Sequence, residues 1–309
     1  MNQIMNVAKV ILPIFLAVSL GVLARSKKLL TPEECQGLQK FVLKFGLPCV
    51  LFNSCLTADI GGESLGTMAM LLPFIILAAL WSFRGRAKHF PYHNFPMLFA
   101  AQETGMLGIP LFMILFGAER AYYMGILDLT QMVTAYPVIA ILSSGGEENP
   151  SLKSILKGMV SSPLMLMSMA GLFLNITGLG AVLDQVGIGA VIQETTGFLA
   201  QPVSALMIFC VGYNFSLAEG SRNVVFRISV VHFIMFAIIG GLVQLLLFLI
   251  PDVDSYTRWA ILLYSVLPAS YLAPGFGKRN EDITVTSGVC SVLTAVSLLI
   301  FCVMAAITA

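Results

Sequence analysis

Ten long apolar runs divide the sequence, and they restrict its fold more than any other feature. Each run is long enough for a helix that crosses the hydrocarbon core of a bilayer, which takes about 20 residues. Because lipid offers no hydrogen-bond partners, a spanning chain must satisfy its backbone within helices or within a closed barrel. The sequence therefore predicts an all-α membrane protein with ten transmembrane helices. These spans fall at roughly 5–24, 37–58, 65–83, 94–118, 120–142, 154–177, 195–218, 228–250, 257–278 and 283–308.

Composition supports this class and argues against several others. The chain of 309 residues is 58% hydrophobic and 11% charged, as expected when the bilayer is the solvent. A net charge of +1 argues against nucleic-acid partners. The six cysteines and three histidines show no metal-ligand spacing, and no Walker, GxSxG or HExxH motif occurs. We therefore expect no enzyme activity, no catalytic residues, and no cofactor or metal.

Lysine and arginine indicate the orientation. If the spans alternate in direction, fourteen of the seventeen basic residues fall on one side, and only Lys9, Arg120 and Arg258 fall on the other. Basic residues gather on the cytosolic side, so both termini are expected on the outer side of the membrane. The membrane is expected to be the cell (inner or plasma) membrane. The first run is interpreted as a retained helix and not as a signal peptide. Basic residues at 25–28 follow it directly, and no convincing small-residue cleavage site precedes them.

The two halves of the chain carry similar patterns of proline, glycine and helix breaks. Pro13 precedes Gly21 by eight residues in span 1, as Pro163 precedes Gly171 in span 6. Spans 2 and 7 each carry a mid-helix proline, and spans 4 and 9 each carry a break. Because each half contains an odd number of spans, the halves are expected to be inverted repeats. The predicted repeats are 1–142 and 154–309, joined by a short cytosolic linker at 143–153.

The break in span 4 combines polar side chains, glycines and a proline in the stretch QETGMLGIPL at 102–111. A second break, VLPASYLAPG at 266–275, lies in the corresponding span of the other half. Broken helices in matching positions are typical of the substrate sites of secondary transporters, although each break could also be a mere kink. The predicted substrate-binding residues are Gln102, Glu103, Thr104, Gly108, Ile109, Pro110, Leu111, Ser270, Tyr271, Pro274 and Gly275.

The first N–H groups of a helix have no partner within it, so proline, which lacks an N–H, is well suited to the first position. Pro110 is predicted to begin the outer half-helix of span 4, with the N–H groups of Leu111 and Phe112 directed at the membrane centre. The same reasoning applies to the residues after Pro274. Such helix ends bind carboxylates without a cationic side chain.

Two acids lie within the apolar runs. Glu103 is predicted to lie on the inner half-helix of span 4, just before the break, where it could carry a proton or ionise beside a bound Na⁺. Asp128 and Gln131, together with Thr134, form a polar stripe on span 5. Intramembrane acids are functional by default, so Glu103, Asp128 and Gln131 are the predicted coupling residues for H⁺ or Na⁺. The alternative for each acid is a hydrogen bond between helices without a role in transport. Helix packing is the favoured role for Asn53, Ser54, Gln201 and Ser204.

At these residues the chain resembles the auxin efflux carrier family, which includes plant PIN carriers and bacterial malate and malonate permeases. Residues 103–111 with the Phe-Gly pair at 116–117 are similar to the family's fourth-helix motif, Asn-Thr-Gly-x-x-Gly-x-Pro-Leu followed by Phe/Tyr-Gly. Residues 267–276 are similar to its ninth-helix pattern, Leu-Pro-x5-Pro-Phe, and residues 12–24 and 45–52 match its first two helices. The resemblance covers essentially the whole chain.

The resemblance implies a fold like those of sodium/proton antiporters and bile-acid symporters. Spans 1, 2, 6 and 7 would form a scaffold, and spans 3–5 and 8–10 a moving transport domain in which spans 4 and 9 cross at their breaks. It also implies a homodimer. Glu103 stands where the family usually has Asn, and Ala273 lies near a position where bacterial members often have Asn. An acid and a methyl group thus replace two neutral amides that would face an organic anion, so cargo or coupling is expected to differ.

The leading functional hypothesis is a secondary active transporter of a small organic solute, with a carboxylate expected, that works by an elevator-type alternating-access mechanism. The expected partners of the protein are thus this solute and the membrane lipid. A second hypothesis is a sodium/proton antiporter in which Glu103 and Asp128 bind only ions. A membrane receptor that has reused the fold of a transporter is the third and weakest.

Overall fold

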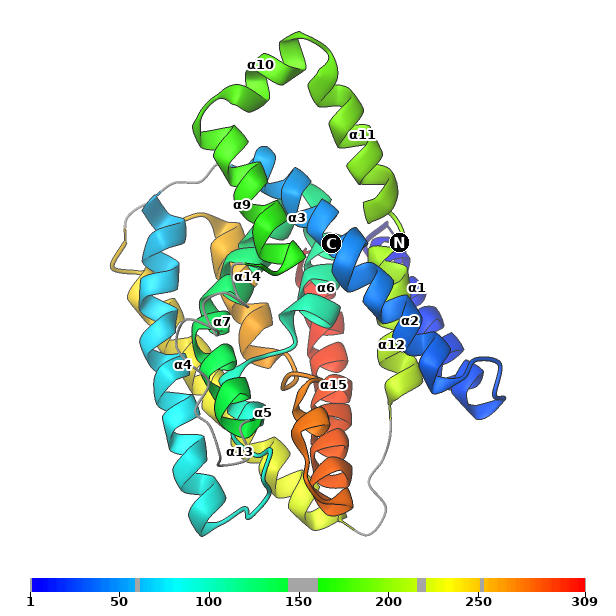
Figure 1. Cartoon of the computed structure of the whole chain (residues 1–309), viewed down its shortest axis with the longest axis vertical. Helices are drawn as coiled ribbons and strands as arrows, with labels where there is room; N and C mark the ends of the chain where they lie inside the picture. Colours follow the sequence, from blue (N-terminus) through cyan, green and yellow to red (C-terminus); the bar gives the residue numbers. More distant parts are fainter. Residues whose placement is uncertain (1, 59–61, 144–160, 216–220, 251–252, 309) are drawn as a thin grey trace.

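The computed structural model describes residues 2–58, 62–143, 161–215, 221–250 and 253–308, and helices dominate this part of the chain (Figure 1). The predicted linker at 143–153 lies almost entirely outside the described residues. The α-helices are α1 (Asn2–Ser26), α2 (Pro32–Phe41), α3 (Leu47–Leu56), α4 (Gly62–Lys88), α5 (Met97–Ala100), α6 (Ile109–Phe116), α7 (Ala121–Ser143), α9 (Pro163–Ile176), α10 (Leu179–Gln185), α11 (Ile188–Ala200), α12 (Val203–Asn214), α13 (Arg222–Leu247), α14 (Ser255–Val266) and α15 (Asn280–Thr308). Shorter turns are π-helical (η1, Val42–Gly46; η2, Thr104–Gly108) or 3-10 (η3, Ala118–Arg120; η4, Ala273–Phe276).

Within the described residues, four helical segments are long and apolar enough to cross a membrane: Ala8–Ser26, Ile188–Asn214, Arg222–Leu247 and Asn280–Thr308. The pair α9 and α10 gives a fifth if it is one span bent by 79°. Helices α4 and α7, of 27 and 23 residues, cover predicted spans 3 and 5. The all-helical class is therefore confirmed, whereas the number of crossings and the inverted repeat stay predictions.

The region between predicted spans 6 and 7 differs from the sequence-based prediction. Instead of a connection, residues 179–200 form helices α10 and α11, which project from one end of the molecule (Figure 1). Gly178 and Gly187, with φ of +70° and +76°, precede these two helices. Glycine adopts this left-handed conformation without steric cost, so the chain turns sharply and each helix restarts at once. Pro163 is likewise not inside its helix but at its start, after the extended N-cap Ser162.

Two pairs of helices make direct backbone contact through glycines. A Cβ atom on Gly21 of α1 would lie 2.1 Å from the carbonyl oxygen of Phe209 in α12, and one on Gly212 would lie 2.2 Å from that of Val18. A Cβ on Gly171 of α9 would lie 2.4 Å from the carbonyl oxygen of Phe52 in α3. No larger residue fits at these positions without displacing backbone. The absence of a side chain therefore sets the close approach of α1 to α12 and of α9 to α3.

The remaining long helices pack into a second group. Helix α13 packs on α14, α15 and α4, and α7 packs on α4 and α14. The large side chains that are fully buried include Phe95, Phe99, Phe236, Tyr264 and Phe301. The interior between these helices is filled by aromatic and aliphatic side chains, and the polar breaks described below lie within it.

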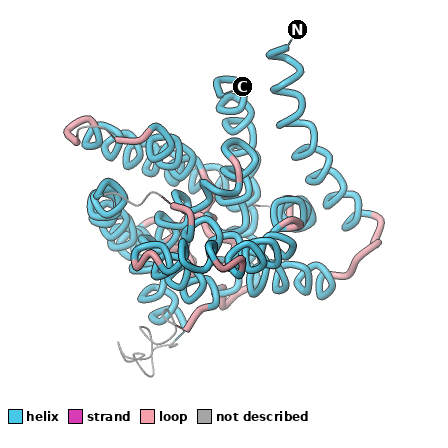
Figure 2. Tube along the Cα trace, turned by 90° about the horizontal axis from the view of Figure 1, so that it is seen from above, coloured by secondary structure: helices cyan, strands magenta, loops and turns pink. Residues whose placement is uncertain are grey.

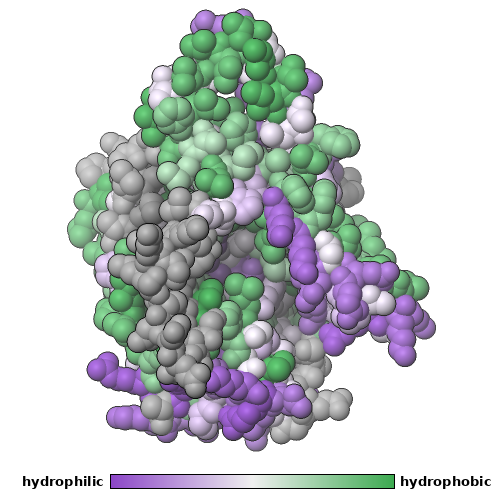
Figure 3. Space-filling model, viewed as in Figure 1, coloured by the Kyte–Doolittle hydropathy of each residue, from purple (hydrophilic) through white to green (hydrophobic). Residues whose placement is uncertain are grey.

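The surface is apolar over wide areas, as expected for helices that face lipid (Figure 3). In Figure 3 the hydrophilic residues gather at the lower end and lower right of the molecule. Basic residues occur where several helices begin or end, as at Arg25 in α1, Lys88 in α4 and Arg222 in α13. Figure 2 shows the N- and C-terminal ends, on α1 and α15, on the same side of the molecule.

Candidate functional site

The break in span 4 begins earlier than the sequence predicts. Helix α5 ends at Ala100, and Ala101 is extended, with φ of −156° and ψ of 146°. The helix restarts with the π-turn η2 at Thr104 and continues directly into α6. Glu103 is therefore not on the inner half-helix, as predicted, but in the break itself, where it is the N-cap of η2.

Pro110 lies in the first turn of α6, but it does not begin the outer half-helix as predicted, because η2 precedes α6 without a gap and the helix restarts at Thr104. The prediction that its neighbours Leu111 and Phe112 expose N–H groups at a helix start is wrong, because the preceding turn η2 already covers that position. The N–H groups at the start of the restarted helix belong instead to residues near Thr104 and Met106. A carboxylate N-cap and two glycines, Gly105 and Gly108, accompany this earlier start.

The break in span 9 has only a short second part. Helix α14 ends at Val266, and the chain then runs without helix to the 3-10 turn η4, which contains Pro274. The N–H of Gly275 donates to the carbonyl oxygen of Leu272 at 3.0 Å. This N–H is therefore paired, and the half-helix predicted after Pro274 is reduced to a single turn before α15 begins.

The two breaks lie side by side and are hydrogen-bonded to each other. Gln102 and Ala269 form an antiparallel bridge. The N–H of Glu103 donates to the carbonyl oxygen of Pro268 at 2.8 Å, and the N–H of Ser270 donates to that of Ala101 at 3.1 Å. Non-helical backbone is tolerated at membrane depth only where it is buried in protein or lines a cavity. Here each unwound segment supplies partners for the other.

The side chain of Glu103 adds a second link between the breaks. Its Oε2 accepts the N–H of Tyr271 at 2.6 Å, and its Oε1 accepts the N–H of Met106 at 3.2 Å. Glu103 is only 7% exposed, so both hydrogen bonds lie in a low-dielectric environment. The carboxylate thus joins the break of span 9 to the restarted helix of span 4.

A polar network centred on Gln131 of α7 supports the span 4 side of the junction. The amide of Gln131 accepts from the N–H of Gln102 at 2.8 Å and donates to its carbonyl oxygen at 2.9 Å. It also donates to Thr104 Oγ1 at 2.7 Å and to Asp128 Oδ1 at 3.0 Å. Thr104 donates to the same oxygen of Asp128. The buried hydroxyl of Tyr264 donates to Gln131 Oε1 at 3.1 Å.

The two predicted coupling residues on span 5, Asp128 and Gln131, therefore lie at the breaks. They are brought together with five of the predicted substrate-binding residues, which are Gln102, Glu103, Thr104, Ser270 and Tyr271. The other predicted residues contribute no polar side chain. Gly108 lies against Leu267 and Met124, and Ile109, Pro110 and Leu111 are buried. Pro274 is half-buried and Gly275 is exposed. A substrate-binding role stays a prediction for all of them.

Sequence reasoning missed several side chains that hold the breaks. Asn94, fully buried, donates to the carbonyl oxygen of Ala273 at 2.8 Å and to Thr286 Oγ1 at 2.9 Å. The hydroxyl groups of Tyr271 and Thr294 lie 2.7 Å apart. Thr134, by contrast, belongs to the predicted polar stripe on span 5, and it donates to the carbonyl oxygen of Ala100 at 2.8 Å. In the sequence, Asn94 is only a polar residue at the start of an apolar run, and its partners lie 179 and 192 residues away.

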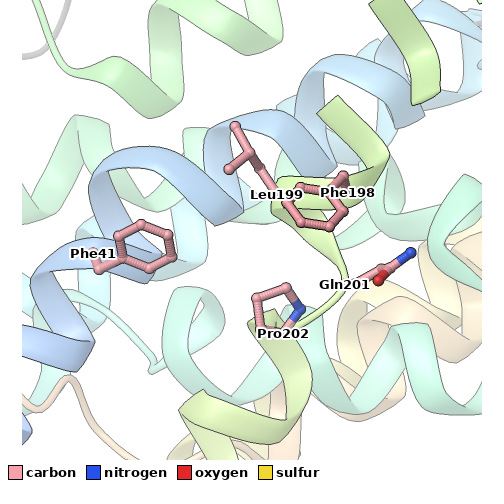
Figure 4. A pocket seen from close by; sticks show the side chains of 5 residues that line it. All are labelled: Phe41, Phe198, Leu199, Gln201 and Pro202. Carbon is pink, nitrogen blue, oxygen red and sulfur yellow. The ribbon is translucent and has the colours of Figure 1, made fainter. Parts of the chain in front are cut away.

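The residues expected in helix packing divide between two roles. Asn53 accepts a hydrogen bond from Thr196 of α11 at 2.6 Å, and Ser54 bonds to the backbone of Glu119 and Tyr122. Gln201 instead lines a cavity of about 400 Å³ between α2 and the turn that joins α11 to α12 (Figure 4). Its other lining residues are Phe41, Phe198, Leu199 and Pro202, so its wall is mostly apolar.

The fold and the paired breaks define the class: a helical membrane protein with a buried polar junction of the kind that transporters use for their cargo. The comparison with protein families agrees with this class. The family described as "membrane transport protein", that of the auxin efflux carriers, matches residues 6–308, and the chain belongs to it. A comparison with curated proteins finds no significant match.

Proposed function

We propose that the chain is a secondary active transporter that binds a small organic solute at the paired breaks of spans 4 and 9. The observation that carries this proposal is the hydrogen-bonded junction of residues 101–103 with residues 268–271. Two unwound segments and two buried acids at one depth are costly in a membrane unless they serve binding. The carboxylate substrate expected from the sequence stays a prediction.

The proposed mechanism is alternating access of an elevator type. The glycine-mediated contacts support a rigid scaffold, because Gly21 joins span 1 to span 7 and Gly171 joins span 6 to span 2. These are the matching pairs that two inverted five-helix repeats would form. The junction would then move with spans 3–5 and 8–10 past this scaffold. The remaining proposals carried over from the family are the crossing of spans 4 and 9, the homodimer, and the position of both termini outside.

Glu103 is the proposed coupling residue. Its protonation would weaken the hydrogen bond from the N–H of Tyr271 or of Met106, because the protonated carboxyl oxygen carries an O–H donor and is a poorer acceptor than a carboxylate oxygen. Asp128 is the second acid at the junction and belongs to the network centred on Gln131. A change in the charge of either acid would therefore change the hydrogen bonds that hold the breaks together, which links ion binding to the conformation of the junction.

Transport by the purified protein in proteoliposomes tests the proposal. A thermal-shift screen of monocarboxylates, dicarboxylates, amino acids and cations at two pH values first selects solutes, since a ligand that binds the folded state raises the melting temperature. Uptake of a selected solute into vesicles, driven by a proton or sodium gradient, is then the expected result. Binding without uptake in any gradient would contradict a transporter and favour a receptor.

A second candidate function is cation antiport. Among the described residues that are buried, the charged side chains are Glu103, Asp128 and Asp282, and none is a lysine or an arginine. Asp282 pairs with Arg279 at 2.8 Å, which leaves the first two acids without a basic partner among these residues. Sodium-driven pH changes in vesicles that contain no organic solute would favour this function over solute transport.

A further inference from the structure

All four polar groups of Glu103 are engaged at the junction. The backbone N–H donates to Pro268, and the carbonyl oxygen accepts from the N–H of Gly108 at 3.0 Å. One carboxylate oxygen accepts from Met106 at 3.2 Å and the other from Tyr271 at 2.6 Å. The side chain is therefore held at both oxygens, which is the arrangement in which N–H groups receive a carboxylate ligand.

Free N–H groups at the start of a helix form a ready-made site for an anion. At this junction only the N–H of Met106 lies at a helix start, in η2, and the N–H of Tyr271 comes from the unwound segment after α14. The chain's own carboxylate receives both N–H groups. An amide side chain could not do this, because it has a single acceptor oxygen and its NH₂ group would face the second N–H.

The junction also holds two acids, Glu103 and Asp128, without a basic side chain beside them among the described residues. Asp128 accepts both of its hydrogen bonds, from Thr104 and Gln131, on Oδ1, and both donors are neutral. No lysine or arginine is buried in the described part of the chain. A buried carboxylate is costly unless it is paired, so a positively charged ligand would stabilise the ionised form of either acid.

An unpartnered amide provides an independent indication of a ligand. Gln102 is 2% exposed, and neither its side-chain nitrogen nor its side-chain oxygen has a hydrogen-bond partner among the described residues. Buried amides are nearly always hydrogen-bonded. Gln102 precedes Glu103 and pairs with Ala269 across the two breaks. Its oxygen could accept a hydrogen bond from an ammonium group or coordinate a metal cation at this site.

We infer that Glu103 determines the charge specificity of the site: it occupies the N–H groups that a substrate carboxylate would need, and the site takes a small cation in preference to an anion. The inference rests on the proposed function. The cation is either an ammonium-bearing solute or an alkali-metal ion, because both would interact with the same excess of carboxylate and amide oxygen.

Thermal stabilisation by charge-matched probes tests the inference. Malonate, 1,3-diaminopropane and Na⁺ are titrated separately against the full-length protein and against the variants Glu103→Gln, Glu103→Asn and Glu119→Gln. Glu119 is an exposed acid paired with Arg120 outside the junction, so its variant controls for the loss of a carboxylate as such. Stabilisation by the diamine alone identifies a solute, and stabilisation by Na⁺ alone identifies an ion.

The wild-type protein and the Glu119→Gln variant are expected to be stabilised by a cation and not by malonate. In the Glu103 variants we expect malonate to act at a concentration at least about tenfold lower than in the wild type, since hydrogen bonds to a charged group are worth that much in binding. Equal or stronger stabilisation of the wild type by malonate than by both cations overturns the inference, even if the variants fail to fold.

Vesicle uptake separates this inference from the proposed function. Cation binding without uptake would contradict the proposed transport function, but it would still support the preference of the site for a cation. Uptake of malonate by the wild type, with no gain in the Glu103 variants, would overturn the charge specificity and leave transport standing.

Discussion

The carboxylate of Glu103 accepts the backbone N–H of Tyr271 at 2.6 Å, across 168 residues of chain. This contact joins the break of one half of the protein to the break of the other. Because the same carboxylate also accepts the N–H of Met106, it connects the start of one helix to an unwound segment that follows another. The charge state of one side chain therefore bears on the relative position of two membrane segments.

Replacement of Glu103 by glutamine is expected to abolish the dependence of solute uptake on pH and sodium. The amide cannot bind or release a proton in the physiological range, and it can accept only one of the two N–H groups. The measurement is uptake in proteoliposomes at two pH values, with and without sodium, beside Glu119→Gln as the control. Unchanged pH and sodium dependence in the Glu103 variant would contradict the proposed role of Glu103 in coupling.

Replacement of Gln131 by leucine is expected to lower the melting temperature more than replacement of Tyr264 by phenylalanine. The first change leaves the N–H of Gln102 without its partner, while the carbonyl oxygen of Gln102 keeps only the N–H of Thr104. Each buried group left unpaired costs about 1–3 kcal/mol. The second change removes one hydroxyl and leaves the pairing of Gln102 intact. Equal shifts in a thermal melt would show that the network does not hold the break.

Replacement of Gly21 by alanine is expected to destabilise the fold, because the new methyl group meets the backbone of α12 at 2.1 Å. Overpacking of this kind costs about 1–3 kcal/mol. Gly241 of α13 has nothing within 4 Å of its Cβ position, so Gly241→Ala is a matched control that should be neutral or slightly stabilising. Similar melting temperatures for the two variants would contradict close backbone contact between α1 and α12.

A disulfide is expected to form between Gln102→Cys and Ala269→Cys. Residues that face each other across an antiparallel pair have Cα atoms about 4.5–5.5 Å apart, within the range that a disulfide requires. The experiment needs a background in which the six native cysteines are replaced by alanine. Mass spectrometry of digested protein should find the cross-linked peptides after oxidation. Their absence, with both single variants folded, would argue against adjacent breaks.

The orientation deduced from lysine and arginine is tested by labelling of single cysteines in intact cells. Cysteines in place of Lys88 at the end of α4 and Arg222 at the start of α13 should react with an impermeant maleimide only after permeabilisation. Both positions are exposed. A cysteine in place of Ser255, exposed at the start of α14, should react without it. The reverse pattern would place the termini in the cytosol.

The sequence was sufficient to locate the breaks, because glycine, proline and polar residues coincide there within apolar runs. It was not sufficient to determine where each helix restarts. Pro110 indicates only that a helix start is tolerated at that position, and the N-cap Glu103 begins the helix at Thr104 instead. In span 9, Pro274 lies in a 3-10 turn, so the half-helix predicted after the break is only a single turn.

The supporting side chains were harder to predict for a different reason. Asn94 bonds to Ala273, 179 residues away, and Tyr264 bonds to Gln131, 133 residues away. A single sequence carries no information on which distant polar groups meet. The acids at 103 and 128 could be singled out because burial of a charge is costly by itself, whereas an asparagine or a tyrosine in an apolar run is unremarkable until its partner is known.

The carboxylate of Glu103 acts as a covalently tethered ligand of the N–H groups of Met106 and Tyr271. A group tethered to its own site competes at an effective concentration that depends on the tether and not on the solution. Free acids must exceed that concentration before they displace it, so a weak apparent affinity for carboxylates would reflect competition from within the chain rather than a lack of suitable N–H donors. An acid assayed on the wild type would thus behave as a competitor of residue 103, and its intrinsic affinity would appear only when that side chain is shortened or neutralised.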